Sequence, residues 1–172
     1  MFRLLSLICL FLMLLCGPIL SNEKIVFIDI DKIIYQSDLG KKLNKKIAND
    51  IKKEDSALKK REKELKQKEN DILKQKNILS KDELNNKISS LKTEINNFKE
   101  KRRSTNKKFA DIRLKQTNSM VMSLNQILSN FANEKSISLI IQKKNIVIGK
   151  SALDITDQIL DIFNKEVKSL KN

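Results

Sequence analysis

The chain has 172 residues, of which 35 are Lys or Arg and 21 are Asp or Glu, so its net charge at pH 7 is +14. It contains no histidine and only two cysteines, which removes the side chains that build transition-metal sites and Ser-His or Cys-His nucleophiles. The three glycines form no phosphate-binding loop, and lysines and carboxylates on long helices are normally solvated. We therefore predict a binding protein with no catalysis, cofactor or metal.

The first 21 residues have the layout of an export signal. Arg3 precedes an almost unbroken apolar run over residues 4–15, and Pro18 follows shortly after it. The run is too short for a membrane-spanning helix, which needs about 20 apolar residues. A basic residue before a short apolar stretch is typical of a signal peptide. We expect cleavage after Ser21 and a periplasmic location.

Both cysteines, Cys9 and Cys16, lie inside this signal, so the mature chain would contain no thiol and no disulfide. An alternative is that Cys16 is the acylated cysteine of a lipoprotein. The bulky Leu15 before it stands where that processing needs a small residue, which favours plain cleavage.

The mature chain should begin with a small folded part. Apolar residues occupy both faces of a predicted strand over residues 25–30, which should therefore lie in a core. A short helix over residues 31–37 follows, with Asp29 or Asp31 as its N-cap. We expect Gly40 to let the backbone bend into the next segment.

Residues 39–135 are predicted to form a long arm of two helical segments. The second segment has seam positions three or four residues apart, the spacing of a coiled coil. They are the apolar Leu84, Ile88, Leu91, Ile95 and Phe98, then the polar Arg102 and Thr105, and then the apolar Phe109 and Ile112. The first repeats every seven residues: Ile51, Leu58, Leu65, Ile72 and Leu79. Its other seam position is polar, which makes the seam thin: Glu54 or Asp55, Glu62, and Glu69 or Lys76.

A turn over residues 79–83 should reverse the chain between these segments. Ser80 and Glu83 have the spacing of a capping box, which starts a new helix. A single continuous helix is the alternative, but the sevenfold repeat would then need apolar residues at Asn86 and Thr93. A first helix of about 60 Å is too long to pack on the rest of the chain, so the hairpin should project.

The arm concentrates the charge. Residues 41–119 contain 25 Lys and Arg but 12 Asp and Glu, a net charge of +13. Such a field attracts polyanions, anionic lipid or acidic proteins, although lysines also simply keep a long helix soluble. The arm also has more apolar residues than one narrow seam can bury, which suits client binding. We predict client contacts at Leu73, Ile78, Met120 and Met122.

The chain should return to the head through two short strands, over residues 137–141 and 146–148, that form a β-hairpin. The stretch Asp154-Ile155-Thr156 offers an N-cap for a last helix that would bury one face: Ile159, Ile162 or Phe163, Val167 and Leu170. The predicted fold is α+β, a small β-sheet head of residues 22–38 and 136–172 with a coiled-coil hairpin inserted. A head this small with an open sheet edge should oligomerise, through Ile28, Ile140 and Val147.

This layout resembles the Skp/OmpH-like family of periplasmic chaperones. The resemblance covers nearly all of the mature chain and depends on these residues: Asp29, Ile33-Ile34, Ser37, Gly40-Lys41, residues 137–141 and Asp154-Ile155-Thr156-Asp157. It implies a jellyfish-like homotrimer whose arms surround a cavity and hold unfolded outer-membrane β-barrel proteins without ATP. It also implies a lipopolysaccharide-binding cluster, whose spacing Lys92, Arg102 and Arg103 match.

Two other functions stay open beside the holdase chaperone. The protein could be a structural coiled coil that tethers envelope layers, or a binder of lipopolysaccharide or an anionic membrane surface. The export signal argues against nucleic acid as a partner. The sequence leaves open which clients bind, which arm face lines the cavity and whether the trimer persists.

Overall fold

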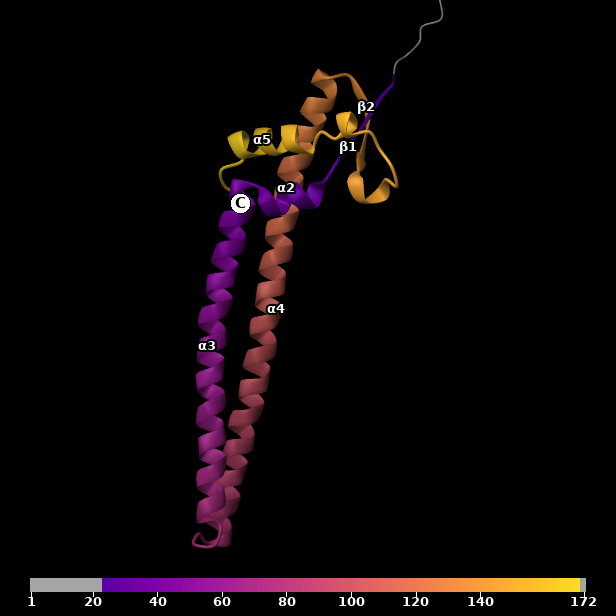
Figure 1. Cartoon of the computed structure of the whole chain (residues 1–172). Helices are drawn as coiled ribbons and strands as arrows, with labels where there is room; N and C mark the ends of the chain where they lie inside the picture. The colour runs from indigo at the N-terminus through magenta and orange to yellow at the C-terminus, as the bar shows by residue number, and fades with distance from the viewer. Residues whose placement is uncertain (1–22, 171–172) are drawn as a thin grey trace, which may run out of the picture.

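The computed structural model describes residues 23–170 and has two parts, a small head and a long helical arm (Figure 1). The predicted signal peptide and Cys16 lie outside the described residues. The elements are β1 (Lys24–Ile28), α2 (Ile30–Gln36), α3 (Asp38–Gln75), α4 (Lys81–Glu134), β2 (Ile137–Gln142), the 3-10 turns η1 (Lys143–Asn145) and η2 (Ser151–Leu153), and α5 (Thr156–Glu166). No described helix is both long and apolar enough to cross a membrane.

The arm is the antiparallel pair α3 and α4, which confirms the predicted hairpin (Figure 1). The capping box is also confirmed. Ser80 Oγ accepts from the Glu83 amide at 3.3 Å, and Glu83 Oε2 accepts from the Ser80 amide at 3.0 Å. α3 ends at Gln75, earlier than the predicted Leu79, because the amides of Ile78 and Leu79 both turn back to the Gln75 carbonyl.

α4 belongs to both parts of the molecule. Its 54 residues make it about 80 Å long, whereas the 38 residues of α3 span about 57 Å. The surplus is the C-terminal end of α4, whose apolar side chains join the head core. The predicted arm boundary at residue 135 is therefore too late. Strict seam spacing hid this, because the apolar repeat continues from the arm into the head without a break.

One apolar core holds the head together. β1, α2, the start of α3, the end of α4, and α5 with its N-cap contribute its buried residues: Val26, Ile28, Ile33, Ile34, Leu39, Met120, Leu124, Ile127, Phe131, Ile155, Ile159 and Phe163. Full burial of one such side chain stabilises a fold by about 1.5–3 kcal/mol. Ile159 and Phe163 confirm the predicted buried face of the last helix, while Val167 and Leu170 lie beyond its end at Glu166 and still pack partly against the core.

The sheet differs from the predicted hairpin. β1 pairs with β2 in parallel, with Val26 opposite Ile140, and the whole arm is the crossover between them. Residues 146–148 form no strand. The preceding residues form the turn η1, and none of them has the positive φ that a tight hairpin turn requires. The described part of the head thus contains two strands and not three.

Gly40 has a different role from the predicted bend. It lies in the first turn of α3 and its φ is not positive. A Cβ at this position would be 1.9 Å from the carbonyl oxygen of Ile34 in α2. Ser37 makes the actual junction, since its Oγ caps α3 by accepting from the Gly40 amide at 3.2 Å. Glycine is therefore needed because the two helices approach closely at the root of the arm.

Candidate binding surface of the arm

The arm seam is partly filled. Leu65 and Phe109 are buried between the helices, and so is the polar Thr105, which stands where an apolar residue would continue the seam. Towards the tip the apolar side chains are exposed: 62% of Leu73, 84% of Ile78 and 48% of Ile88 are accessible. Two of the predicted client contacts, Leu73 and Ile78, are therefore available at the end of the arm farthest from the head (Figure 1).

A polar line runs beside this seam and joins the two helices. Glu94 of α4 accepts from Lys68 Nζ at 2.8 Å and from Arg61 Nη2 at 2.7 Å, both on α3. Hydrogen bonding and charge from Lys68, reinforced by Arg61, outweigh partial desolvation and lower the pKa of Glu94. We call this group of three residues the clasp. Farther along, Lys87 Nζ donates to Gln75 Oε1 at 3.0 Å.

The clasp explains why the first-helix seam is thin. The second seam position was predicted at Glu62 and Glu69, but the side chains that reach α4 are Arg61 and Lys68, one position earlier. Sequence reasoning missed the clasp itself. Its signal was present, because Arg61 and Lys68 are seven residues apart and so share one helix face.

Two half-open grooves lie between α3 and α4, one on each side of Glu94. The first, nearer the head, has a volume of about 310 Å³ and an almost wholly apolar accessible wall; its lining residues are Glu54, Ala57, Leu58, Arg61, Glu94, Asn97, Phe98 and Lys101. We call it the Phe98 groove. The second, nearer the tip, has about 350 Å³ and a wall as polar as it is apolar, lined chiefly by Lys68, Asp71, Ile72, Gln75, Lys87 and Leu91.

The predicted polyanion cluster is exposed but spread out. The side chains of Lys92, Arg102 and Arg103 all face solvent. In residues 23–170 none of the three takes part in an ion pair. Lys92 and Arg103 share a helix face because they are eleven residues apart, which also separates them by about 16 Å. A ligand that contacts both must bridge much of this distance.

The two methionines differ. Met122 is 73% exposed, as a client contact requires. Met120 is only 2% exposed because it packs in the head core, so its prediction as a client contact is corrected. The two were predicted together because sequence spacing alone did not reveal that the head core reaches this part of α4.

The three predicted oligomerisation residues also differ in their exposure to solvent. Ile28 is 1% exposed and faces its own core, so it cannot contact another chain, and that prediction is corrected. Ile140 is half-buried, whereas Val147 is fully exposed. Sequence reasoning missed further exposed apolar residues on the head: Ile25, Leu139, Ile148 and Leu153. Ile25 and Leu139 are register partners on neighbouring strands, which places them side by side.

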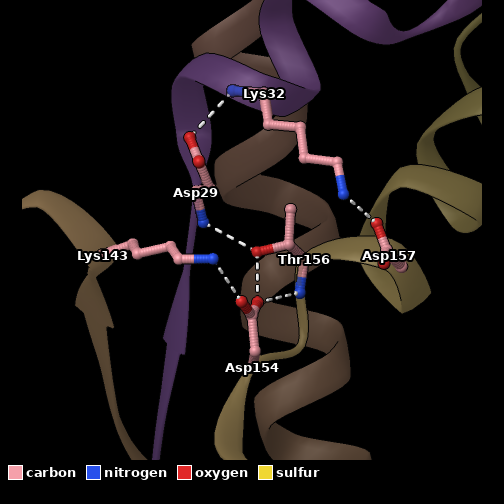
Figure 2. Close-up of polar contacts among 6 residues, drawn as sticks. All are labelled: Asp29, Lys32, Lys143, Asp154, Thr156 and Asp157. Atoms are coloured by element: carbon pink, nitrogen blue, oxygen red, sulfur yellow. Dashed lines mark hydrogen bonds and ion pairs between the residues drawn. The ribbon is translucent and has the colours of Figure 1, made fainter. Parts of the chain in front are cut away.

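The motif residues at the two ends of the chain meet in one polar cluster of the head (Figure 2). The Asp29 amide donates to Thr156 Oγ1 at 2.9 Å, and Asp29 Oδ1 caps α2 by accepting from the Lys32 amide at 2.9 Å. The N-cap of α5, predicted within Asp154-Ile155-Thr156, is Ile155. Asp154 Oδ1 accepts from the Thr156 amide at 3.0 Å.

Two ion pairs complete this cluster. Lys143 Nζ lies 2.7 Å from Asp154 Oδ2, and Lys32 Nζ lies 2.5 Å from Asp157 Oδ1 (Figure 2). Burial opposes ionisation of Asp154, but hydrogen bonds from Lys143 and Thr156 prevail and lower its pKa. Every acidic group here has a protein partner, and the described residues contain no group of acidic, Cys or His side chains that could hold a metal. The cluster therefore joins segments more than 120 residues apart and is structural.

Together, the small head, the single long hairpin and the basic arm define a class of proteins that present a projecting helical arm for binding. The chain belongs to the OmpH-like (Skp) family, because the family model described as "Outer membrane protein (OmpH-like)" matches residues 24–163. Among solved structures, a candidate OmpH-like outer membrane chaperone from Caulobacter crescentus CB15 is similar, with a TM-score of 0.79, 17% identity and 91% of each chain covered. No curated protein matches the chain.

Proposed function

We propose that this protein is an ATP-independent holdase chaperone of the periplasm, which binds unfolded outer-membrane β-barrel proteins and prevents their aggregation in transit. One observation carries the proposal: the arm combines a net charge of +13 with exposed apolar side chains at its tip, Leu73 and Ile78. The charge steers acidic chains towards the arm, and apolar contacts hold them after arrival. Membership of the OmpH-like family supports the same function.

We propose further that the working form is a homotrimer whose arms surround a cavity. The support is the exposed apolar set on the head, which includes Ile25, Leu139, Val147 and Ile148. In the described head, the outer edge of β1 is met at Phe27 by the segment at Asp154, whereas β2 pairs only with β1, so one edge of β2 stays open to pairing. Association of heads would cover both the apolar residues and this edge.

Binding of lipopolysaccharide or an anionic membrane surface is a second candidate, favoured by the exposure of Lys92, Arg102 and Arg103. Since Lys92 and Arg103 are about 16 Å apart along α4, a ligand with two separated phosphate groups would match them best. An envelope tether remains the other alternative. A tether would need its arm for length alone and would not protect unfolded proteins.

The test is aggregation of a urea-unfolded outer-membrane β-barrel protein on dilution, followed by light scattering without nucleotide. The mature chain should suppress scattering. The double variant Leu73→Ser with Ile78→Ser should release the client roughly thirtyfold faster, because each side chain contributes about 1 kcal/mol when partly buried by a client and about 1.4 kcal/mol corresponds to a factor of ten. Leu114→Ser is the matched control, since Leu114 is also 62% exposed but lies nearer the head.

The control should change release less than threefold. Scattering that is the same with and without the wild-type protein would contradict the holdase function. Unchanged release from the double variant, with normal suppression by the wild type, would show that the tip does not hold clients.

A further inference from the structure

The Phe98 groove is a gap in the arm's own packing. Leu58 of α3 and Phe98 of α4 are its large apolar lining residues, and the only other apolar side chain in the lining is the small Ala57 of α3. One layer of the seam nearby is filled by Thr105 in place of a large apolar residue. A well-packed coiled coil inserts a side chain into every such hole. An apolar hole that this chain leaves open can be filled by a side chain from another molecule.

Its size indicates what fits. A volume of about 310 Å³ lies at the lower end of the range for ligand pockets, about 300–1,000 Å³. The groove is half-open, so an extended polypeptide could lie across the arm and insert one side chain. The second groove, nearer the tip, is slightly larger but has a polar wall. The Phe98 groove is therefore the better apolar receptor of the two.

The charges at the rim select among apolar side chains. Two cations, Arg61 and Lys101, and two carboxylates, Glu54 and Glu94, line the groove. Arg61 is held in place by hydrogen bonds to Glu64 and Glu94. In the part of the chain that the structure describes, no ion pair engages Lys101. A cation attracts the negative face of an aromatic ring, and it offers nothing comparable to an aliphatic side chain.

We propose that the Phe98 groove is a binding site for aromatic side chains of an extended, unfolded polypeptide. The groove would be one of the places where the proposed chaperone binds its clients, so its biological role depends on the proposed function. Outer-membrane β-barrels contain girdles of aromatic residues that face lipid after folding, so such a chain offers many aromatic side chains while it is unfolded. Binding at the groove would hold these side chains apart from one another.

The site can be tested with a short unfolded peptide that contains one tryptophan. The protein itself has no tryptophan, so all tryptophan emission comes from the peptide. Titration into the full mature chain should shift the emission to the blue and raise its anisotropy. Two competitor peptides carry phenylalanine or leucine in place of the tryptophan, so neither adds tryptophan emission. The leucine peptide should displace the tryptophan peptide at least threefold less well than the phenylalanine peptide does.

Two variants locate the site. Ala57→Leu fills the groove without changing charge and should weaken tryptophan-peptide binding at least tenfold. Ala48→Leu is the matched control, because Ala48 is exposed on the same helix and does not line the groove, and it should stay within twofold. Both alanine and leucine are strong helix formers, so α3 should keep its helicity. Lys101→Gln should weaken binding about two- to fivefold, the size of one exposed cation–aromatic contact.

Unchanged binding by Ala57→Leu would overturn the proposal, and so would equal competition by the leucine peptide. Loss of binding in Ala48→Leu as well would also overturn it, since the effect would not be local. Aggregation suppression is measured on the same wild-type sample. If the wild type binds the aromatic peptide in the groove but does not suppress aggregation, the holdase function fails and the site remains. If it suppresses aggregation and Ala57→Leu still binds the peptide, only the site fails.

Discussion

Replacing Gly40 by alanine should destabilise the protein, against the usual trend for helices. In an ordinary helical position, glycine to alanine is stabilising by about 1 kcal/mol. Here the new Cβ would lie 1.9 Å from the Ile34 carbonyl oxygen, and ordinary contact begins near 3.4 Å. The obstacle is backbone, so α2 and α3 must move apart by more than an ångström. Overpacking of this kind costs about 1–3 kcal/mol and at times more.

The net expectation for Gly40→Ala is a loss of about 1–2 kcal/mol, or a fall in Tm of about 2–8 °C for a chain of this size. Thermal unfolding by circular dichroism measures it, with wild type and variant at equal concentration because association also stabilises. Ala48→Gly is the control, since it reverses the substitution at an exposed position of α3 and should cost about 0.5–1 kcal/mol. A Tm that rises in Gly40→Ala would refute the argument from close approach.

Three further predictions concern charge and association. The triple change of Lys92, Arg102 and Arg103 to Glu should slow the capture of an acidic unfolded barrel protein severalfold and make the capture rate less dependent on salt. The release rate should change less. Stopped flow at two salt concentrations measures both rates. The pKa of Glu94 is lowered, so the stability that the clasp contributes is complete above the ordinary pKa of 4.5 and is lost as pH falls below it. The distance between spin labels on α3 and α4 should therefore increase as pH falls below 4.5. Glu94→Gln should remove that transition. If the proposed trimer forms through the head, Val147→Asp should dissociate it in sedimentation while arm helicity stays unchanged, because an unpaired charge is costly in an apolar interface. A variant that sediments like the wild-type trimer would exclude Val147 from the interface.

Much of the arm could be predicted because its signals are local. The heptad of α3, the closer apolar spacing of α4 and the Ser80–Glu83 capping box each depend on residues only a few positions apart. The clasp was missed although Arg61 and Lys68 carry a regular spacing. The rotation of each helix about its axis decides which line of polar residues faces the other helix of the arm. An error of one residue, as at Glu62, corresponds to a rotation of about 100°.

The head shows what only the tertiary structure decided. Its strand, its short helix and its last helix are readable from the sequence, since apolar pattern and caps act within each segment. The parallel pairing of β1 with β2 is a contact across the whole arm, and no local pattern specifies it. The burial of Met120 and Ile28, and the close approach that requires Gly40, likewise depend on elements distant in sequence. Local chemistry thus determined the elements and the charge of this protein, and long-range packing determined which side chains remain available for binding.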